Sequence, residues 1–309
     1  PPEAERPGEA RPPPARGFVR VAGFDVRVAS LPEGERAKGG VQLERRVAEA
    51  QSRCNDLADT QRALRFLLGC NCDVTEALAR AQEVAEWRRR HDMDGLRARL
   101  RAEVDAGAGG DAPPVSLPYQ DEIGKLATMN PCVLTAADGG PVSVWHVGSA
   151  SASAAAAAPG DALAAWSRGV FEYVDLWLTG RSEAVGCLIG HVQVFNLSGL
   201  GFRQVTNTAL IDKLKLLFGA GGFYLEAVSH IYIVNSSRVF NMAWGAAKAF
   251  ISPRTAEKIS VNQGVPKELL AALSADSAAR LQDVLRRPQP GLPAMRPAAG
   301  PGSAQRPGG

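Results

Sequence analysis

The chain has 309 residues, of which 45% are apolar, and it carries a formal net charge of +3. This length and apolar content allow one large domain with a buried core, or two smaller domains. The charge is too small to indicate a dedicated nucleic-acid-binding protein, although a local basic face could still meet anionic lipid. No stretch reaches about 18 uncharged apolar residues, and the proline-rich start lacks the apolar region of a signal peptide, so we expect a soluble protein.

Cysteine usage indicates a reducing compartment and no metal. The five cysteines are odd in number and irregularly spaced: Cys54, Cys70, Cys72, Cys132 and Cys187. We therefore expect reduced thiols of an intracellular protein rather than a disulfide framework. Cys70 and Cys72 lie two residues apart but lack the second cysteine or histidine pair that a zinc site needs, so no metal is expected.

Both ends of the chain differ in composition from its middle. Residues 1–16 and 287–309 are rich in proline, glycine and alanine, which predicts disordered tails. Residues 17–29 alternate apolar and polar side chains, which indicates a hairpin or an edge strand. Nothing in the sequence shows what this segment packs against.

A helical module follows the possible hairpin. Apolar residues recur at helical spacing over 43–68 and again over 74–90, and a shorter helix is expected over 94–104. Asp73 is suited to cap the second of these helices, and Glu76 would complete a capping box. We predict an N-terminal helical module over residues 43–107.

The pattern changes after the glycine-rich stretch 105–114. Residues 131–147 indicate two strands joined by a turn at Asp138–Gly140. Helices are then predicted over 162–178, 203–218, from Arg238 onward and over 266–273, and strands within 184–197, 230–235 and 258–262. Continuous apolar strands that alternate with helices indicate a largely parallel sheet covered on its faces. The predicted fold class is therefore α/β, with a helical N-terminal module and a second domain over residues 115–286.

The segment from Arg238 to Ile251 predicts a helix that is apolar around most of its circumference. One stripe consists of Phe240, Trp244, Ala247 and Ile251, and Val239, Met242, Ala246 and Phe250 widen it. A helix packed on a sheet normally has one apolar stripe and one polar face. Two interpretations stay open: a fully buried core helix, or a movable lid over a hydrophobic cavity that enters the membrane surface when it opens.

The stretch HIYIVNSSRVFNMAWGAAKAFISPRTAEKI (230–259) closely resembles the hallmark segment of CRAL-TRIO domains, the family of secretory phosphatidylinositol/phosphatidylcholine transfer proteins. Residues 64–92 resemble the helical module of that family. The segments ADGGPVSVW (137–145), VFEY (170–173) and NLSGLGF (196–202) match it in the expected order. The resemblance covers residues 55–275. It implies a parallel sheet that floors an apolar lipid pocket, a gate helix that closes the pocket, and one-for-one lipid exchange with membranes in which no bond is made or broken.

The resemblance also implies particular site residues. The lipid headgroup site carries over to Glu226, Thr255 and Lys258, where the lysine would pair with phosphate, the threonine would donate to it, and the glutamate would accept from inositol hydroxyls or orient the lysine. The alternative is a structural ion pair on a solvated turn. The expected gate and pocket residues are Phe240, Met242, Trp244, Ala247, Phe250 and Ile251.

The sequence departs from the family pattern at several polar positions. The basic headgroup residue of the family falls at Cys70 and its basic neighbour at Leu68, so the best bidentate phosphate ligand is lost. The hydroxyl-bearing positions associated with phosphatidylcholine fall at His191 and Gln193. Together with Phe195, these two residues are expected to line the pocket. The ligand therefore stays open between another phospholipid, a sterol and an isoprenoid.

Other signals point away from catalysis and nucleotide binding. The glycines at 199–201 and 219–222 complete no phosphate-binding motif, and Ser236 and Ser237 lack the context of a hydrolase nucleophile. The arginines at 88–90, 97, 99 and 101 indicate a solvated basic helix surface, with contact to anionic lipid as the alternative. We expect no catalytic residues and no cofactor other than a bound lipid.

These observations favour a monomeric lipid carrier, cytoplasmic and peripheral at membranes, whose partners are a phospholipid or another hydrophobic ligand and a transient membrane surface, with no nucleic acid. The main alternative is a protein-interaction, scaffold or lipid-sensing module with a degenerate pocket. An α/β enzyme acting on a small molecule is a third class, which no residue constellation supports.

Overall fold

The computed structural model describes residues 17–36, 38, 40–107, 115–123, 129–149, 157–201, 207–238, 240–241, 244 and 256–287. The two predicted tails therefore lie outside the described residues, apart from Arg287. The chain divides into two compact units: the first comprises Pro1–Gln82 with Gly186–Leu188, and the second comprises Glu83–Val185 with Ile189–Gly309.

The first unit contains the predicted hairpin. Strand β1 (Phe18–Val21) pairs antiparallel with β2 (Phe24–Arg27) through a turn at Ala22 and Gly23, which both have positive φ. This geometry suits a two-residue hairpin, because it matches the twist of the strands. Asp25 then exchanges backbone hydrogen bonds with a distant segment, from its own N–H to Gly186 O (2.9 Å) and from Leu188 N–H to its O (2.9 Å). The hairpin is confirmed, and residues 186–188 are the partner that the sequence did not reveal.

The run predicted as one helix over 43–68 is two helices. After η1 (Val28–Ser30) and α1 (Glu33–Arg36) comes α2 (Val41–Arg53), and α3 (Thr60–Gly69) begins only after the turn η2 (Asn55–Leu57). The backbone is extended at Cys54 (φ −146°, ψ 115°), which ends α2. Asp59 then accepts a hydrogen bond from Arg62 N–H (2.7 Å) and starts α3 as an N-cap. A single helix was wrong because an apolar spacing that continues across a cap hides the break.

Two predicted helices follow. Helix α4 (Val74–Arg90) begins with the predicted cap, in which Asp73 accepts from Glu76 N–H at 2.9 Å, and α5 (Met93–Gly107) comes directly after it. The division between the two units falls inside α4. A short helix, α6 (Gln120–Ile123), lies beyond it in the second unit.

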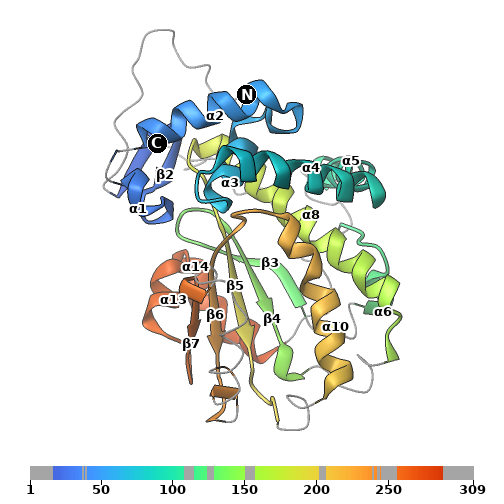
Figure 1. Ribbon diagram of the computed structural model, residues 1–309. Coiled ribbons are helices and arrows are strands. Elements are labelled where there is room, and N and C mark those ends of the chain that lie inside the picture. Colours follow the sequence, from blue (N-terminus) through green and yellow to red (C-terminus); the bar gives the residue numbers. More distant parts are fainter. Residues whose placement is uncertain are drawn as a thin grey trace, which may run out of the picture. The chain divides into compact units, whose positions relative to one another are not determined.

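The described strands of the second unit form a five-stranded sheet in chain order (Figure 1). Strand β3 (Met129–Thr135) pairs antiparallel with β4 (Pro141–Trp145) across the predicted turn, where Asp138 accepts from Gly140 N–H at 2.9 Å. Strands β5 (His191–Asn196), β6 (Val228–Val234) and β7 (Ile259–Val261) continue the sheet, and each pairs parallel with its neighbour. The predicted α/β class with a mostly parallel sheet and a helical N-terminal part is confirmed.

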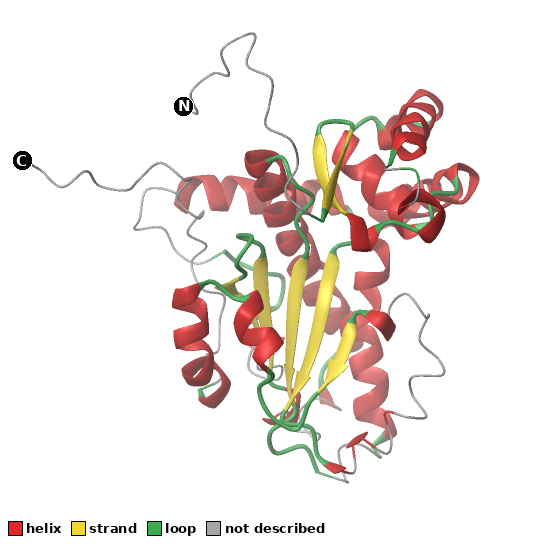
Figure 2. Ribbon diagram, turned by 90° about the vertical axis from the view of Figure 1, so that its left-hand side faces the viewer, coloured by secondary structure: helices red, strands yellow, loops and turns green. Residues whose placement is uncertain are grey.

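Helices lie on both sides of this sheet (Figures 1 and 2). The turn η3 (Val147–Ser149) follows β4, the long helix α8 (Gly160–Val185) precedes β5, and α10 (Thr208–Gly219) with η4 (Ala220–Phe223) precedes β6. Helix α13 (Lys267–Ala272) confirms the predicted helix near the C-terminal end. Helix α14 (Ala275–Arg286) was missed, although Ser274 caps it by accepting from Ser277 N–H at 3.3 Å.

One face of the sheet is packed solidly against α13 and α14. Its core consists of alternate strand residues and the apolar stripes of the two helices: Val142, Val144, Val192, Val194, Tyr232, Val234, Leu269, Leu273, Leu281, Val284 and Leu285. None of these residues is more than 8% exposed. We call this the packed face. The residues between them in sequence point to the opposite side, because side chains alternate along a strand.

Within the part of the chain that the structure describes, no helix combines the length and the apolarity needed to span a bilayer. The longest of these helices, α8, carries charged residues such as Arg168 and Glu172 along its length.

Candidate functional site

The face opposite the packed face, here called the open face, carries apolar side chains that are only partly buried. In register across four strands, one row contains Ser143, Gln193, Ile231 and Ile259, and the next contains Trp145, Phe195, Ile233 and Val261. Phe195, Ile231, Ile259 and Val261 are intermediate in exposure, whereas Val192, Val194, Tyr232 and Val234 on the packed face are buried. The five strands contain no Asp, Glu, Lys or Arg. The open face is thus apolar, uncharged and incompletely covered.

Aromatic side chains cover one end of the open face. Trp145 and Phe195 stack with ring centroids 5.8 Å apart, and Phe218 of α10 lies 4.8 Å from the first and 5.4 Å from the second. Trp145 is 3% exposed, yet its indole N–H has no hydrogen-bond partner among the described residues. The hydroxyl of Tyr173 on α8 is buried and unpartnered in the same sense. A buried donor without a partner is costly, so each of these groups is suited to a missing acceptor.

A polar network lies within this apolar face. His191 Nε2 is 2.8 Å from Ser143 Oγ, and Gln193 Nε2 is 3.4 Å from His191 Nδ1. Ser143 Oγ also accepts a hydrogen bond from Cys132 N–H at 2.9 Å. We call Ser143, His191 and Gln193 the polar triad. Two of its members, His191 and Gln193, were predicted from the sequence, and Ser143 was not.

Burial fixes the charge state of the polar triad. It lowers the pKa of His191 to about 3, so the imidazole is neutral at physiological pH. Because Gln193 Nε2 is a donor, His191 Nδ1 must accept, and the ring proton then sits on Nε2 and is donated to Ser143. Burial also raises the pKa of the Cys132 thiol to about 12, although the Ser143 hydroxyl opposes this rise. The network is therefore neutral throughout.

The segment predicted as the gate is described only at its start. Phe240 N–H donates to Ser237 Oγ (3.2 Å) and Asn241 N–H donates to Ser237 O (3.0 Å), which is the pattern of a capped first helical turn. Phe240 and Trp244 stack one turn apart, with ring centroids at 6.1 Å. The other predicted gate residues, Met242, Ala247, Phe250 and Ile251, lie outside the described residues.

An amide cluster anchors the chain where the predicted gate begins. Asn235, at φ 56°, donates to Asn196 Oδ1 at 2.9 Å, and Asn196 in turn donates to Leu285 O at 3.0 Å. Ser236 N–H donates to Asn262 O at 3.0 Å, which ties the same point to the end of β7. These bonds hold the start of the segment on the carboxyl ends of three neighbouring strands.

The predicted headgroup residues are partly brought together. Lys258 Nζ lies 2.9 Å from Glu226 Oε2 and also donates to Val228 O at 2.9 Å, with both charged side chains largely buried. Thr255, the third predicted member, lies outside the described residues. Cys70 and Leu68, which fall at basic positions of the family pattern, are buried in the first unit.

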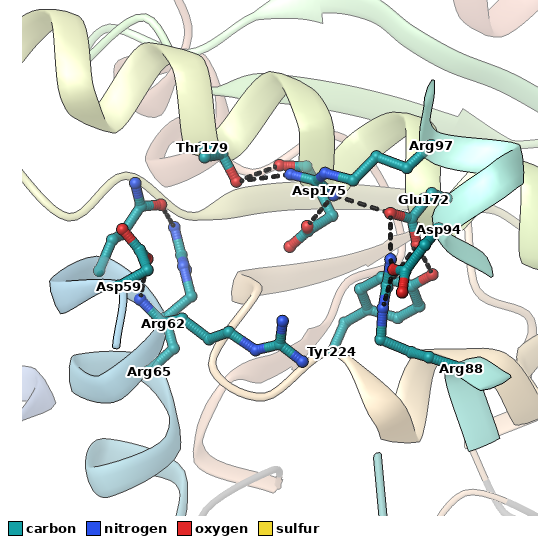
Figure 3. Close-up of polar contacts among 11 residues, drawn as sticks. Asp59, Arg62, Arg65, Arg88, Asp94, Arg97, Glu172, Asp175, Thr179 and Tyr224 are labelled. Carbon is teal, nitrogen blue, oxygen red and sulfur yellow. Dashed lines mark hydrogen bonds and ion pairs between the residues drawn. The ribbon is translucent and has the colours of Figure 1, made fainter. Parts of the chain in front are cut away.

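The basic cluster predicted as a solvated surface is in part a buried ion-pair network (Figure 3). Glu172 of α8 is fully buried and binds Arg88 at 2.9 Å and Arg97 at 2.8 Å, while Arg97 also binds Asp175 at 2.7 Å. The Tyr224 hydroxyl donates to Glu172 at 2.6 Å. Burial opposes ionisation of Glu172, but the hydrogen bonds and charges of the arginines hold its pKa below the ordinary value. The solvated interpretation is wrong for Arg88 and Arg97 because α8 buries a carboxylate opposite them.

Metal chemistry has no obvious place in the described part of the molecule. Across those residues, no group of three or more His, Cys, Asp or Glu side chains could hold a metal ion. The described features suited to contact another molecule are the open face, its polar triad and the Glu226–Lys258 pair.

A comparison with known protein families matches one stretch of this chain. Residues 170–277 match the family model of the CRAL/TRIO domain, a range that includes the second half of α8, β5, β6, β7 and α13. This stretch of the chain is therefore similar to a CRAL/TRIO domain, and the resemblance found in the sequence is confirmed.

Particular relatives are transfer proteins. Phosphatidylinositol/phosphatidylcholine transfer protein SFH4 of Arabidopsis thaliana is 33% identical over 70 residues, which are 22% of this chain and 11% of that protein. Its relative SFH9 of the same plant is 29% identical over 70 residues, covering 23% of this chain and 12% of the other. The chain thus spans only a small part of the length of these curated relatives. Among solved structures, the crystal structure of Sfh5 aligns with a TM-score of 0.46 at 16% identity and covers 66% of each chain.

Proposed function

We propose that the second unit binds a lipid against the open face of its sheet and exchanges it with membranes. The observation that carries this proposal is the difference between the two sheet faces. The packed face is closed by the protein's own helices, whereas Phe195, Ile231, Ile259 and Val261 on the open face keep exposed apolar surface. Exposed apolar surface in the interior layer of a domain is stabilised by an apolar partner. The names of the two plant relatives support a lipid as that partner.

Energetics require that such a ligand be enclosed during transit. At roughly 0.8 kcal/mol per methylene, an acyl chain of about fifteen carbons exposed to water costs on the order of 12 kcal/mol. In this proposal the segment from Arg238 to Ile251 covers the ligand, because its sequence is apolar on nearly all sides. The anchored amide cluster at Asn196 and Asn235 gives this cover a fixed point from which to open.

The Glu226–Lys258 pair is proposed to meet a phosphorylated headgroup, together with Thr255. Lys258 supplies the positive charge that would pair with a phosphate, and its Nζ lies 2.9 Å from Glu226 Oε2. The same carboxylate could accept hydrogen bonds from headgroup hydroxyls. In the absence of such a lipid, the two residues form a structural ion pair.

In its biological setting we propose a monomeric, cytoplasmic protein that meets membranes at their surface. Its cargo is a bound lipid rather than a cofactor, and its action makes and breaks no covalent bond. The opened cover would present Phe240 and Trp244 to the bilayer, where aromatic side chains are favoured at the interface.

The test is lipid transfer between vesicles with a charge placed in the cover. The purified chain should carry a fluorescent lipid from donor to acceptor vesicles, and native mass spectrometry should find lipid bound to it. Trp244→Asp should abolish transfer, because an ionised carboxylate opposes both closure and membrane entry. The control is Leu270→Asp, which charges an apolar residue that is already 41% exposed on α13 and should leave transfer unchanged.

The same experiment distinguishes the lipid carrier from the alternative, a protein-interaction module with a degenerate pocket. Folded protein that neither holds nor takes up any lipid would overturn the carrier proposal and favour that module. Normal transfer by folded Trp244→Asp protein would overturn the role assigned to the cover.

A further inference from the structure

The polar triad is an unusual feature of a face that otherwise suits hydrocarbon. It is buried, with His191 2% and Gln193 4% exposed, and its three members are joined in series from Ser143 through His191 to Gln193. Gln193 lies in register with Ile231, so a lipid on the open face, which is the function proposed above, would lie beside this network. The chemistry of the network then restricts the ligand.

One of the two hydrogen bonds that join the triad is much weaker than the other. The His191–Ser143 bond is 2.8 Å long and Ser143 is further held by Cys132 N–H, whereas the Gln193–His191 bond is 3.4 Å long. A hydrogen bond of that length contributes little, so it can be exchanged for a bond to a ligand. The two atoms it releases differ in kind: His191 Nδ1 accepts, and Gln193 Nε2 donates.

A hydroxyl group matches this pair of atoms, and a phosphate does not. A hydroxyl can donate to His191 Nδ1 and accept from Gln193 at the same time. A phosphodiester can only accept, so its oxygens would face the lone pair of Nδ1. It would also bring a buried negative charge to strands that contain no lysine or arginine.

We infer that the polar triad selects a lipid whose polar end is a hydroxyl, such as a sterol or another long-chain alcohol, and excludes the phosphate of phosphatidylcholine from this part of the face. The triad takes the hydroxyl by opening the Gln193–His191 bond, while the His191–Ser143 bond keeps the imidazole in place. Ser143 is then a positioning residue, which fixes the imidazole for the contacts that His191 Nδ1 and Gln193 make with the ligand.

The experiment compares three probes in the full chain. Vesicles supply a fluorescent sterol with a free hydroxyl, the same sterol as its ketone, or a pyrene-labelled phosphatidylcholine, and uptake is followed by energy transfer from the protein's tryptophans. The hydroxyl sterol should bind roughly tenfold more tightly than the ketone, because the ketone leaves His191 Nδ1 facing an acceptor. The hydroxyl sterol should also bind more tightly than phosphatidylcholine, by at least the same factor.

Variants assign the selectivity to the triad. In the double variant His191→Ser with Gln193→Thr, two hydroxyl donors replace the acceptor, so preference should shift roughly tenfold toward phosphatidylcholine. The matched control is His230→Gln, which changes a histidine of β6 that lies beside Val192 on the packed face. It should leave the order of the three probes unchanged.

A milder variant covers the case in which the double variant does not fold, judged by circular dichroism. In Ser143→Ala the imidazole loses the acceptor that fixes its tautomer, so the difference between alcohol and ketone should shrink severalfold. Equal uptake of alcohol and ketone by the wild type, or a preference for phosphatidylcholine, would overturn the selectivity while lipid carriage stands. No uptake of any probe would overturn lipid carriage itself.

Discussion

The two faces of the five-stranded sheet differ in how completely the rest of the protein covers them. On the packed face, valines of β4, β5 and β6 meet leucines of α13 and α14, and the described side chains leave almost nothing exposed. On the open face, the same strands carry bulkier and partly exposed apolar residues with a neutral polar triad among them. A strand exposes alternate residues to alternate sides, so a single sequence can encode a core on one side and a binding surface on the other.

The way in which the helices are held differs as well. Helices α13 and α14 are held mainly by apolar contacts, whereas α8, which contacts β3 and β4, is tied by Glu172 to Arg88 and Arg97 (Figure 3). The first arrangement gains from area buried and the second from charge pairing, which fails abruptly when one partner is removed.

Removal of the buried charge should have the largest effect. Glu172→Gln leaves the guanidinium groups of Arg88 and Arg97 without their shared, fully buried carboxylate and should lower the free energy of unfolding by about 3–5 kcal/mol. Urea denaturation measures this change. Glu86→Gln breaks an exposed pair with Arg90 and should cost at most about 0.5 kcal/mol, so equal losses in the two variants would contradict the buried network.

A truncation on each face should separate packing from binding. Leu281→Ala on the packed face should cost about 3 kcal/mol, because it leaves a cavity in a closed core. Ile259→Ala on the open face should cost about 1 kcal/mol or less in lipid-free protein, since its side chain is already partly exposed, yet it should weaken lipid retention. Denaturation curves and lipid uptake, measured on both variants, give the comparison. A large stability loss in Ile259→Ala would mean that the two faces are packed alike.

Acidification by about one pH unit below the ordinary histidine pKa should reveal the polar triad with a smaller effect. The pKa of His191 is about 3 in the folded protein, below the value of about 6.5 expected in the unfolded chain, so the unfolded state binds more protons between these values. Stability should therefore be complete above pH 6.5 and should fall by up to about 1.4 kcal/mol per pH unit as the pH drops toward 3. His191→Gln should remove this part of the slope. His91→Gln, at a less buried site, should change the slope much less.

Much of the fold could be predicted because the relevant patterns are local. The Asp73 cap, the turn at Asp138–Gly140 and the alternation of apolar strands with helices each depend on a few neighbouring residues. Two features escaped for physical reasons. The break between α2 and α3 leaves the apolar spacing intact, and α14 follows α13 after only two residues, so its own serine cap was overlooked.

The site could be predicted only in part, since its polar contacts join distant residues. His191, Gln193 and Phe195 were expected at the site, and the structure places them on the open face. Ser143 was missed because a serine in an apolar strand carries no signal by itself, although its alternation with Trp145 places both on one side. The pairing of Arg88 and Arg97 with Glu172, more than 70 residues away, could not be inferred from a run of arginines that resembles a hydrated surface.

The backbone bonds between Asp25 and residues 186–188 have a consequence for synthesis and for fragment design. During translation, the N-terminal hairpin has to wait until well over a hundred further residues have left the ribosome before its edge is satisfied. A fragment ending at Gln82 would lack this last piece and would present a bare strand edge to other chains. Any expression strategy that cuts the protein between its two units should therefore favour aggregation of the shorter product.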